Sequence, residues 1–105
     1  MATNARPIAC TLSGKQLRDR RAWIADLAHD GLLSHRRGDL ALCLRYRPDV
    51  VGRVRRMVQL EEACCAFLSF HLHEQPDAVT LTIKAPEEAR EIADGMFDQF
   101  VATAR

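Results

Sequence analysis

A glutamate and two adjacent cysteines, Glu61, Cys64 and Cys65, are the residues of this sequence whose types and spacing are best suited to chemistry. Residues three and four positions apart lie on the same side of an α-helix, so a helix through this segment places both thiols beside the Glu61 carboxylate. A buried carboxylate requires a proton, a counter-charge or a bound ligand. The spacing therefore predicts a site made of one carboxylate and two thiols.

The apolar residues of the predicted central helix, which runs from about Val50 to Phe67, indicate which carboxylate points inward. Glu61 falls near the middle of the apolar stripe when the residues are projected at about 100° per position. Glu62 is rotated by roughly 100° from it and is expected to face solvent. The stripe consists of Val50, Val54, Met57, Val58 and Leu68.

The preceding predicted helix offers a counter-charge for this carboxylate. Arg20 projects into the middle of its apolar face, and Arg21 lies at the edge of that face. An Arg20–Glu61 ion pair would keep Glu61 ionised inside the protein. The apolar face consists of Leu17, Trp23, Ile24 and Leu27.

Two adjacent thiols on one helix can bind a single soft metal or metalloid ion with little backbone change. Cys10 shares the inner face of a predicted first strand and could supply a third sulfur. Cys64, Cys65 and Cys10, or two of these thiols with Glu61, would then hold Zn²⁺ or a softer cation. The sequence predicts a metal-binding or small-molecule-binding thiol protein on this basis.

The same residues also fit a cysteine-dependent enzyme or thiol redox protein. Cys65 would be the nucleophile, Glu61 an acid or base, and Arg20 a cation that lowers the thiol pKa. An ionised and unpaired Glu61 would instead raise that pKa. A third interpretation is a non-catalytic homodimer that associates through an open sheet face.

Cys43, His71 and His73 alternate onto the outer face of the predicted sheet. They define a possible second site, although solvent-facing histidines without a ligand are the simpler interpretation of this pattern.

The periodicity of the remaining sequence predicts the elements that position these residues. The order is β-α-β-β-α-β-β-α, which favours an α+β fold with the helices on one face of a mainly antiparallel sheet. The expected elements are a strand over residues 8–12, a helix over 15–30 capped by Ser13, a hairpin of 32–37 and 40–47 turning at Gly38-Asp39, the central helix capped by Asp49, a second hairpin of 69–74 and 79–84, and a last helix from Pro86 to about Val101.

Length and composition limit the function classes. The 105 residues fit one domain over 1–105, with 48% apolar residues, 28% charged residues and a net charge of +1. This balance argues against a nucleic-acid partner, and no segment reaches the roughly 20 apolar residues of a membrane span. The N-terminus lacks the apolar core of a signal peptide. We expect a cytoplasmic protein whose cysteines are reduced thiols or ligands.

Glu62, Cys64, Cys65, Phe67, Leu68 and Phe70 match the pattern E-x-C-C-x-F-L-x-F. With it, the chain resembles a group of short, largely uncharacterised bacterial proteins. The Ile8–Leu12 segment and the Ala85-Pro86 helix opening are also similar to theirs. The resemblance implies an intact family domain and no particular activity. The motif includes Glu62 and so makes it a second candidate for the functional carboxylate, whereas the helical projection favours Glu61.

Overall fold

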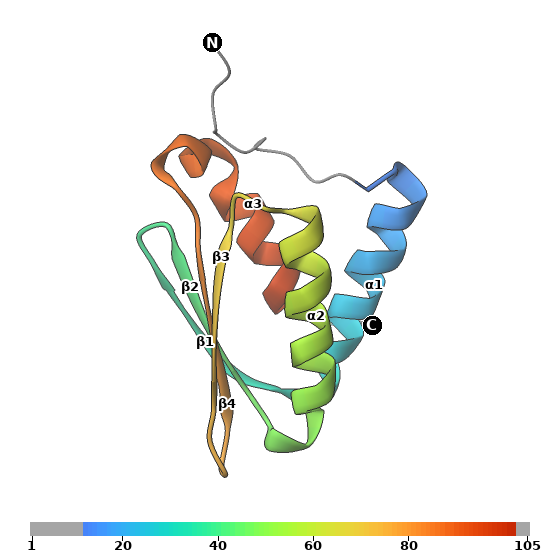
Figure 1. Ribbon diagram of the computed structural model, residues 1–105, viewed down its shortest axis with the longest axis vertical. Helices are drawn as coiled ribbons and strands as arrows, with labels where there is room; N and C mark the ends of the chain where they lie inside the picture. The colour runs from blue at the N-terminus through green and yellow to red at the C-terminus, as the bar shows by residue number, and fades with distance from the viewer. Residues whose placement is uncertain (1–11, 103–105) are drawn as a thin grey trace.

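The computed structural model describes residues 12–102 (Figure 1). Within this range the elements follow the order α-β-β-α-β-β-α. Of the predicted strand over 8–12, residues 8–11 lie outside the described residues, and Leu12 belongs to no element. The elements are α1 (Gly14–Gly31), β1 (Leu32–Gly38), β2 (Ala41–Tyr46), α2 (Val51–Cys64), β3 (Ser69–Glu74), β4 (Val79–Lys84) and α3 (Arg90–Val101), with the 3₁₀ helices η1 (Pro48–Val50) before α2 and η2 (Glu87–Ala89) before α3.

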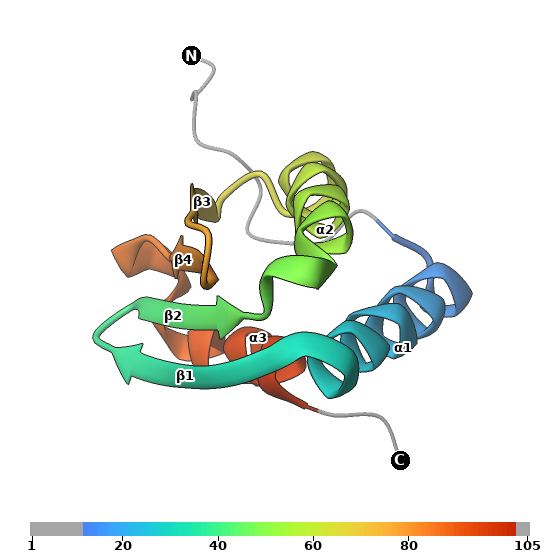
Figure 2. The same cartoon turned by 90° about the horizontal axis from the view of Figure 1, so that it is seen from below.

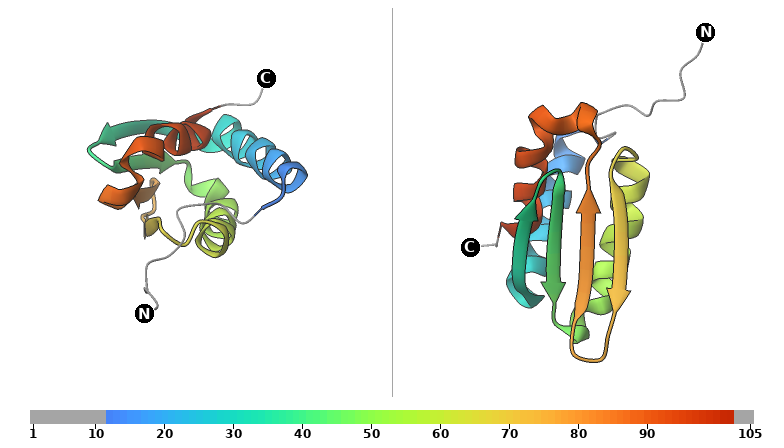
Figure 3. Two further views of the ribbon diagram at one scale, coloured as in Figure 1. Left: turned by 90° about the horizontal axis from the view of Figure 1, so that it is seen from above. Right: turned by 90° about the vertical axis from the view of Figure 1, so that its left-hand side faces the viewer.

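The four strands form one antiparallel sheet in the order β1-β2-β4-β3. All three helices lie on one face of it, as the right-hand view of Figure 3 shows. Helices α2 and α3 lie next to the sheet, and α1 lies farther out, across the space between them (Figures 1 and 2). The predicted α+β fold, with helices on one face of an antiparallel sheet, is confirmed.

The inner face of the sheet is a row of apolar side chains. Leu44 pairs with Leu81, and Leu81 pairs in turn with Leu72, so all three point toward the helices. Leu44 and Leu81 are completely buried. Alternation of apolar and polar residues dictates this register, because a slip by one residue would turn every side chain to the opposite face. Both predicted hairpins are therefore confirmed.

Helix α1 begins and ends where the sequence indicates. The Ser13 hydroxyl accepts a hydrogen bond from the Gln16 amide, and the Gln16 side chain accepts one from the Ser13 amide. This reciprocal capping box satisfies two of the amides that a helix leaves unpaired at its start. At the other end Gly31 is buried, and a Cβ placed there would lie 2.5 Å from a Val50 methyl group. Only glycine fits this contact without displacing Val50.

The start of α2 differs from the prediction. Asp49 does not cap the helix; its carboxylate accepts a hydrogen bond from Arg47 at 2.9 Å. Pro48–Val50 form a 3₁₀ turn instead, and Val50 occupies the cap position without a side-chain hydrogen bond. Proline suits the first position of such a turn because its nitrogen needs no partner there.

The end of α2 also differs from the prediction, and this end carries the two adjacent cysteines of the predicted site. The helix stops at Cys64, three residues before the predicted Phe67, and Cys65 is the C-cap residue with φ −119° and ψ 69°. Leu68, which was expected in the helical stripe, lies beyond the helix yet is 5% exposed. The continuous apolar pattern therefore reflects a buried turn rather than further helix.

Two connections are shifted by one or more residues from the prediction. Gly38 pairs with Ala41, so the first hairpin turns at Asp39-Leu40, and Leu40 has a φ of +52°. The commonest two-residue hairpin loops also contain residues with positive φ values. Pro86 precedes η2 as its cap residue, and α3 proper begins only at Arg90.

The outer face of the sheet is polar and carries a basic excess. Arg36, Cys43, Thr82 and His71 follow one another across its four strands. This face offers little apolar area for a homodimer, which stays a prediction. None of the helices within residues 12–102 has the length and apolarity that a membrane span requires.

Candidate functional site

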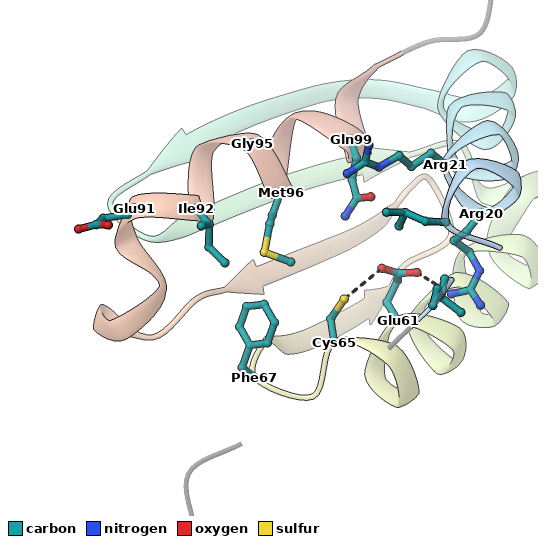
Figure 4. A pocket seen from close by; sticks show the side chains of 12 residues that line it. Arg20, Arg21, Glu61, Cys65, Phe67, Glu91, Ile92, Gly95, Met96 and Gln99 are labelled. Atoms are coloured by element: carbon teal, nitrogen blue, oxygen red, sulfur yellow. Dashed lines mark hydrogen bonds and ion pairs between the residues drawn. The ribbon is translucent and has the colours of Figure 1, made fainter. Parts of the chain in front are cut away.

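A pocket of about 450 Å³ lies between α1, the end of α2 and α3. Figure 4 shows Glu61 and Cys65 on one side of it, Met96 and Gln99 of α3 on the other, and Arg20 and Arg21 of α1 at one end. The pocket is thus built from three segments that are far apart in the sequence. Its lining residues are Leu12, Leu17, Arg20, Arg21, Glu61, Cys65, Phe67, Glu91, Ile92, Gly95, Met96 and Gln99.

The end of α2 turns Cys65 into this pocket. The Cys65 amide donates to the Glu61 carbonyl at 2.6 Å, which completes the last helical hydrogen bond. The Leu68 amide then donates to the Cys65 carbonyl at 3.0 Å, so the chain reverses tightly and leads into β3. The Cys65 side chain faces inward because of this turn, and not because the helix continues.

Glu61 and Arg20 form the predicted buried ion pair. The Arg20 guanidinium donates to the Glu61 carboxylate at 2.7 Å, with side-chain exposures of 16% and 3%. Glu62 is exposed. The structure therefore confirms Glu61 as the inward carboxylate. Guanidinium contact compensates the desolvation that this burial imposes on the carboxylate.

The Cys65 thiol lies against this ion pair. Its sulfur is 4.0 Å from Oε1 of Glu61 and 3.6 Å from the sulfur of Cys64. Burial and, to a smaller extent, the negative charge of Glu61 raise the pKa of Cys65 to about 11, while Arg20 opposes this shift. At neutral pH the residue is consequently a protonated thiol whose hydrogen can point to a carboxylate. Arg20 does not lower its pKa overall.

The predicted metal ligands are brought together only in part. Cys64, Cys65 and Glu61 are neighbours, but the buried Cys64 is disulfide-bonded, so the expectation that it is a free thiol ligand is wrong and Cys65 is the free thiol of this group. Cys10 lies outside the described residues, so a third sulfur stays a prediction. Among residues 12–102, no group of three or more histidine, cysteine or acidic side chains has a geometry suited to a metal ion.

The strand order separates the residues of the second predicted site, Cys43, His71 and His73. β4 lies between β2 and β3, so Thr82 stands between Cys43 and His71. Two strand spacings separate the backbone of Cys43 from that of the histidines by about 10 Å, and within residues 12–102 these side chains form no group of three suited to a metal ion.

Sequence reasoning missed the contribution of α3. Ile92, Met96 and Gln99 are spaced by four and three residues, so they share one face of this helix and line the pocket. That periodic spacing is visible in the sequence, but an isolated helix does not show which neighbour its face meets. The sequence therefore does not indicate that this face of α3 lines the pocket.

No protein-family model matches this chain, and searches of curated proteins and of solved structures also find no match. The resemblance carried by the E-x-C-C-x-F-L-x-F segment accordingly stays a prediction.

Proposed function

We propose that this protein binds a soft metal or metalloid species through the Cys65 sulfur. One observation carries the proposal: a buried thiol faces a pocket of about 450 Å³ and has a carboxylate, fixed by an arginine, 4.0 Å from its sulfur. A cysteine that only fills space in a core needs neither the pocket nor the ion pair.

Glu61 has a specific role in this proposal. Soft ions bind thiolates, so the Cys65 proton must leave when the ligand arrives. With a thiol pKa of about 11, spontaneous ionisation at neutral pH is rare. The Glu61 carboxylate lies where it can accept this proton and pass it on. The ion pair with Arg20 holds the carboxylate in that position.

The Cys64 sulfur lies 3.6 Å from the Cys65 sulfur, but Cys64 is disulfide-bonded and supplies no second thiolate. The proposal itself rests on Cys65. Soft ions tolerate sites with few, sulfur-rich ligands, whereas harder ions need more oxygen donors.

The same geometry supports a second candidate, a cysteine-dependent enzyme. Here Cys65 is a nucleophile that Glu61 activates as a general base in the presence of substrate. The role expected for Arg20 changes in this version: it positions Glu61 instead of lowering the thiol pKa. A cytoplasmic location stays a prediction, because the disulfide of Cys64 is unusual in a reducing compartment.

Protection from alkylation tests the binding of an ion by Cys65. The protein, with the disulfide of Cys64 left intact, is treated with iodoacetamide at pH 8 in the presence or absence of Cd²⁺ or arsenite. Labelling continues until Cys65 is partly modified without the ions, and Cys43 and Cys65 are quantified by mass spectrometry. We expect an equimolar amount of one of these ions to protect Cys65 and to leave the half-buried Cys43 reactive. Cys43 thus serves as the control within the same chain. Equal labelling of Cys65 with and without both ions would overturn the proposal.

A further inference from the structure

Arg21 provides a positive charge at the pocket that no side chain neutralises within residues 12–102. The neighbouring Arg20 is committed to Glu61 at 2.7 Å, so this pair contributes no net charge. Arg21 also lines the pocket, is exposed, and forms no ion pair with the described residues. Gln99 lies beside it and adds an amide that can donate hydrogen bonds (Figure 4).

The opposite part of the pocket is apolar. Phe67 and Met96 lie on either side of the cavity there, and Ile92 extends it along α3 (Figure 4). Glu91 also belongs to the lining, but its carboxylate points away from Cys65 and Met96 in this view. The pocket therefore has a cationic, hydrogen-bonding end and an apolar end.

We propose that this pocket binds a small organic anion with an apolar body. Its carboxylate would contact Arg21 and Gln99, and its hydrocarbon part would lie along Met96 and Phe67. The volume of about 450 Å³ falls in the range of small-molecule sites, roughly 300–1,000 Å³, and is far larger than a bare ion requires. Planar guanidinium groups are suited to carboxylates because they donate two parallel hydrogen bonds. This ligand needs no bond to Cys65, so the proposal goes beyond metal or metalloid capture.

A titration with octanoate, followed by amide chemical shifts in ¹⁵N-labelled protein, tests the charge requirement. We expect octanoate to shift the Gly95 amide and the Gln99 side-chain amide, and octylamine of the same chain length to bind at least about tenfold more weakly. The Arg21→Ala variant should lose about tenfold in octanoate affinity. The matched control is Arg18→Ala, which removes an exposed arginine of the same helix that does not line the pocket.

Gly95 allows the pocket to be filled without disturbing its polar groups. A Cβ at this position meets no atom within 4 Å, and an alanine or leucine also favours the helix. We expect Gly95→Leu to fold and to lose octanoate binding, while Gly95→Ala keeps it. Equal binding of octanoate and octylamine would overturn the proposal, as would equal losses in Arg21→Ala and Arg18→Ala, or unchanged binding in Gly95→Leu.

Octanoate binding does not depend on the metal or metalloid binding proposed above. Octanoate should bind the parent protein in the absence of any metal or metalloid ion, and Arg21→Ala should still bind Cd²⁺. A failure of either proposal is thus recognised separately.

Discussion

The buried ion pair offers the sharpest test of how this site is held together. Replacement of Arg20 by alanine leaves the Glu61 carboxylate, which is 3% exposed, without its counter-charge. Removal of one partner from a buried ion pair typically costs about 3–5 kcal/mol. That is a large part of the roughly 5–15 kcal/mol by which a domain of this kind is stable.

The chain contains a matched exposed pair for comparison. Arg53 and Asp30 are also 2.7 Å apart, but their side chains are 37% and 49% exposed. An ion pair in water contributes at most about 1 kcal/mol. We therefore expect Arg53→Ala to lower the free energy of unfolding by less than about 1 kcal/mol. The two substitutions differ in burial and not in ion-pair distance.

The assay is urea unfolding at pH 7 followed by circular dichroism. With an m-value of about 1.5 kcal/mol per molar urea, a loss of 3 kcal/mol lowers the midpoint by about 2 M. Because Arg20→Ala is strongly destabilised, the double variant with Glu61→Gln is measured too. It removes the uncompensated charge and should recover about 2 kcal/mol or more relative to Arg20→Ala.

Two results would refute this reasoning. The first is an Arg20→Ala variant that loses no more stability than Arg53→Ala. The second is additivity of Arg20→Ala and Glu61→Gln, since independent effects would mean that the carboxylate does not depend on the guanidinium.

Three further predictions concern pH and local packing. The folded state raises the pKa of Cys65 from 9.0 to about 11, so the free energy of unfolding should fall by roughly 2–3 kcal/mol as the pH rises from below 9 to 11. Urea unfolding at several pH values should show this loss in the parent protein and not in Cys65→Ser, and the same pH dependence in both would contradict the prediction. Gly31→Ala should destabilise the protein by about 1–3 kcal/mol because its Cβ would lie 2.5 Å from Val50, whereas Gly52→Ala, with open space around its Cβ, should stabilise it by about 0.5–1 kcal/mol. Thermal melting compares the two variants, and melting temperatures that shift in the same direction would contradict the Gly31–Val50 contact. Ser13→Ala should remove the capping box and lower the free energy of unfolding by about 1 kcal/mol; an unchanged urea midpoint would show that the cap contributes nothing.

The sequence predicted most of the fold because local patterns determine it. Alternation decided the faces of both hairpins, and the Ser13 cap located the start of α1. The helical projection also distinguished Glu61 from Glu62, since a shift of one residue rotates a side chain by about 100°. Arg20 was found in the same way, because it interrupts an apolar face that must meet another element.

The end of α2 and the pocket were not predicted, for two physical reasons. The segment from Cys65 to Leu68 is as apolar as a buried helix, and it contains no glycine or proline that would indicate where the helix ends. The pocket depends on how α1 lies across α2 and α3, a tertiary arrangement that no local pattern encodes. Met96 and Gln99 could therefore be assigned to a helix face but not to a site.

The central claim is that Cys65 captures a soft ion with the help of Glu61. It is tested most directly by titration of the protein, with the disulfide of Cys64 left intact, with Cd²⁺. The ultraviolet charge-transfer band of the cadmium–sulfur bond is followed in the parent protein and in the Cys65→Ser, Cys43→Ser and Glu61→Gln variants. We predict one tightly bound Cd²⁺ per chain in the parent protein and in Cys43→Ser, slower capture in Glu61→Gln, and no band in Cys65→Ser. A band of equal intensity and affinity in Cys65→Ser would contradict the account.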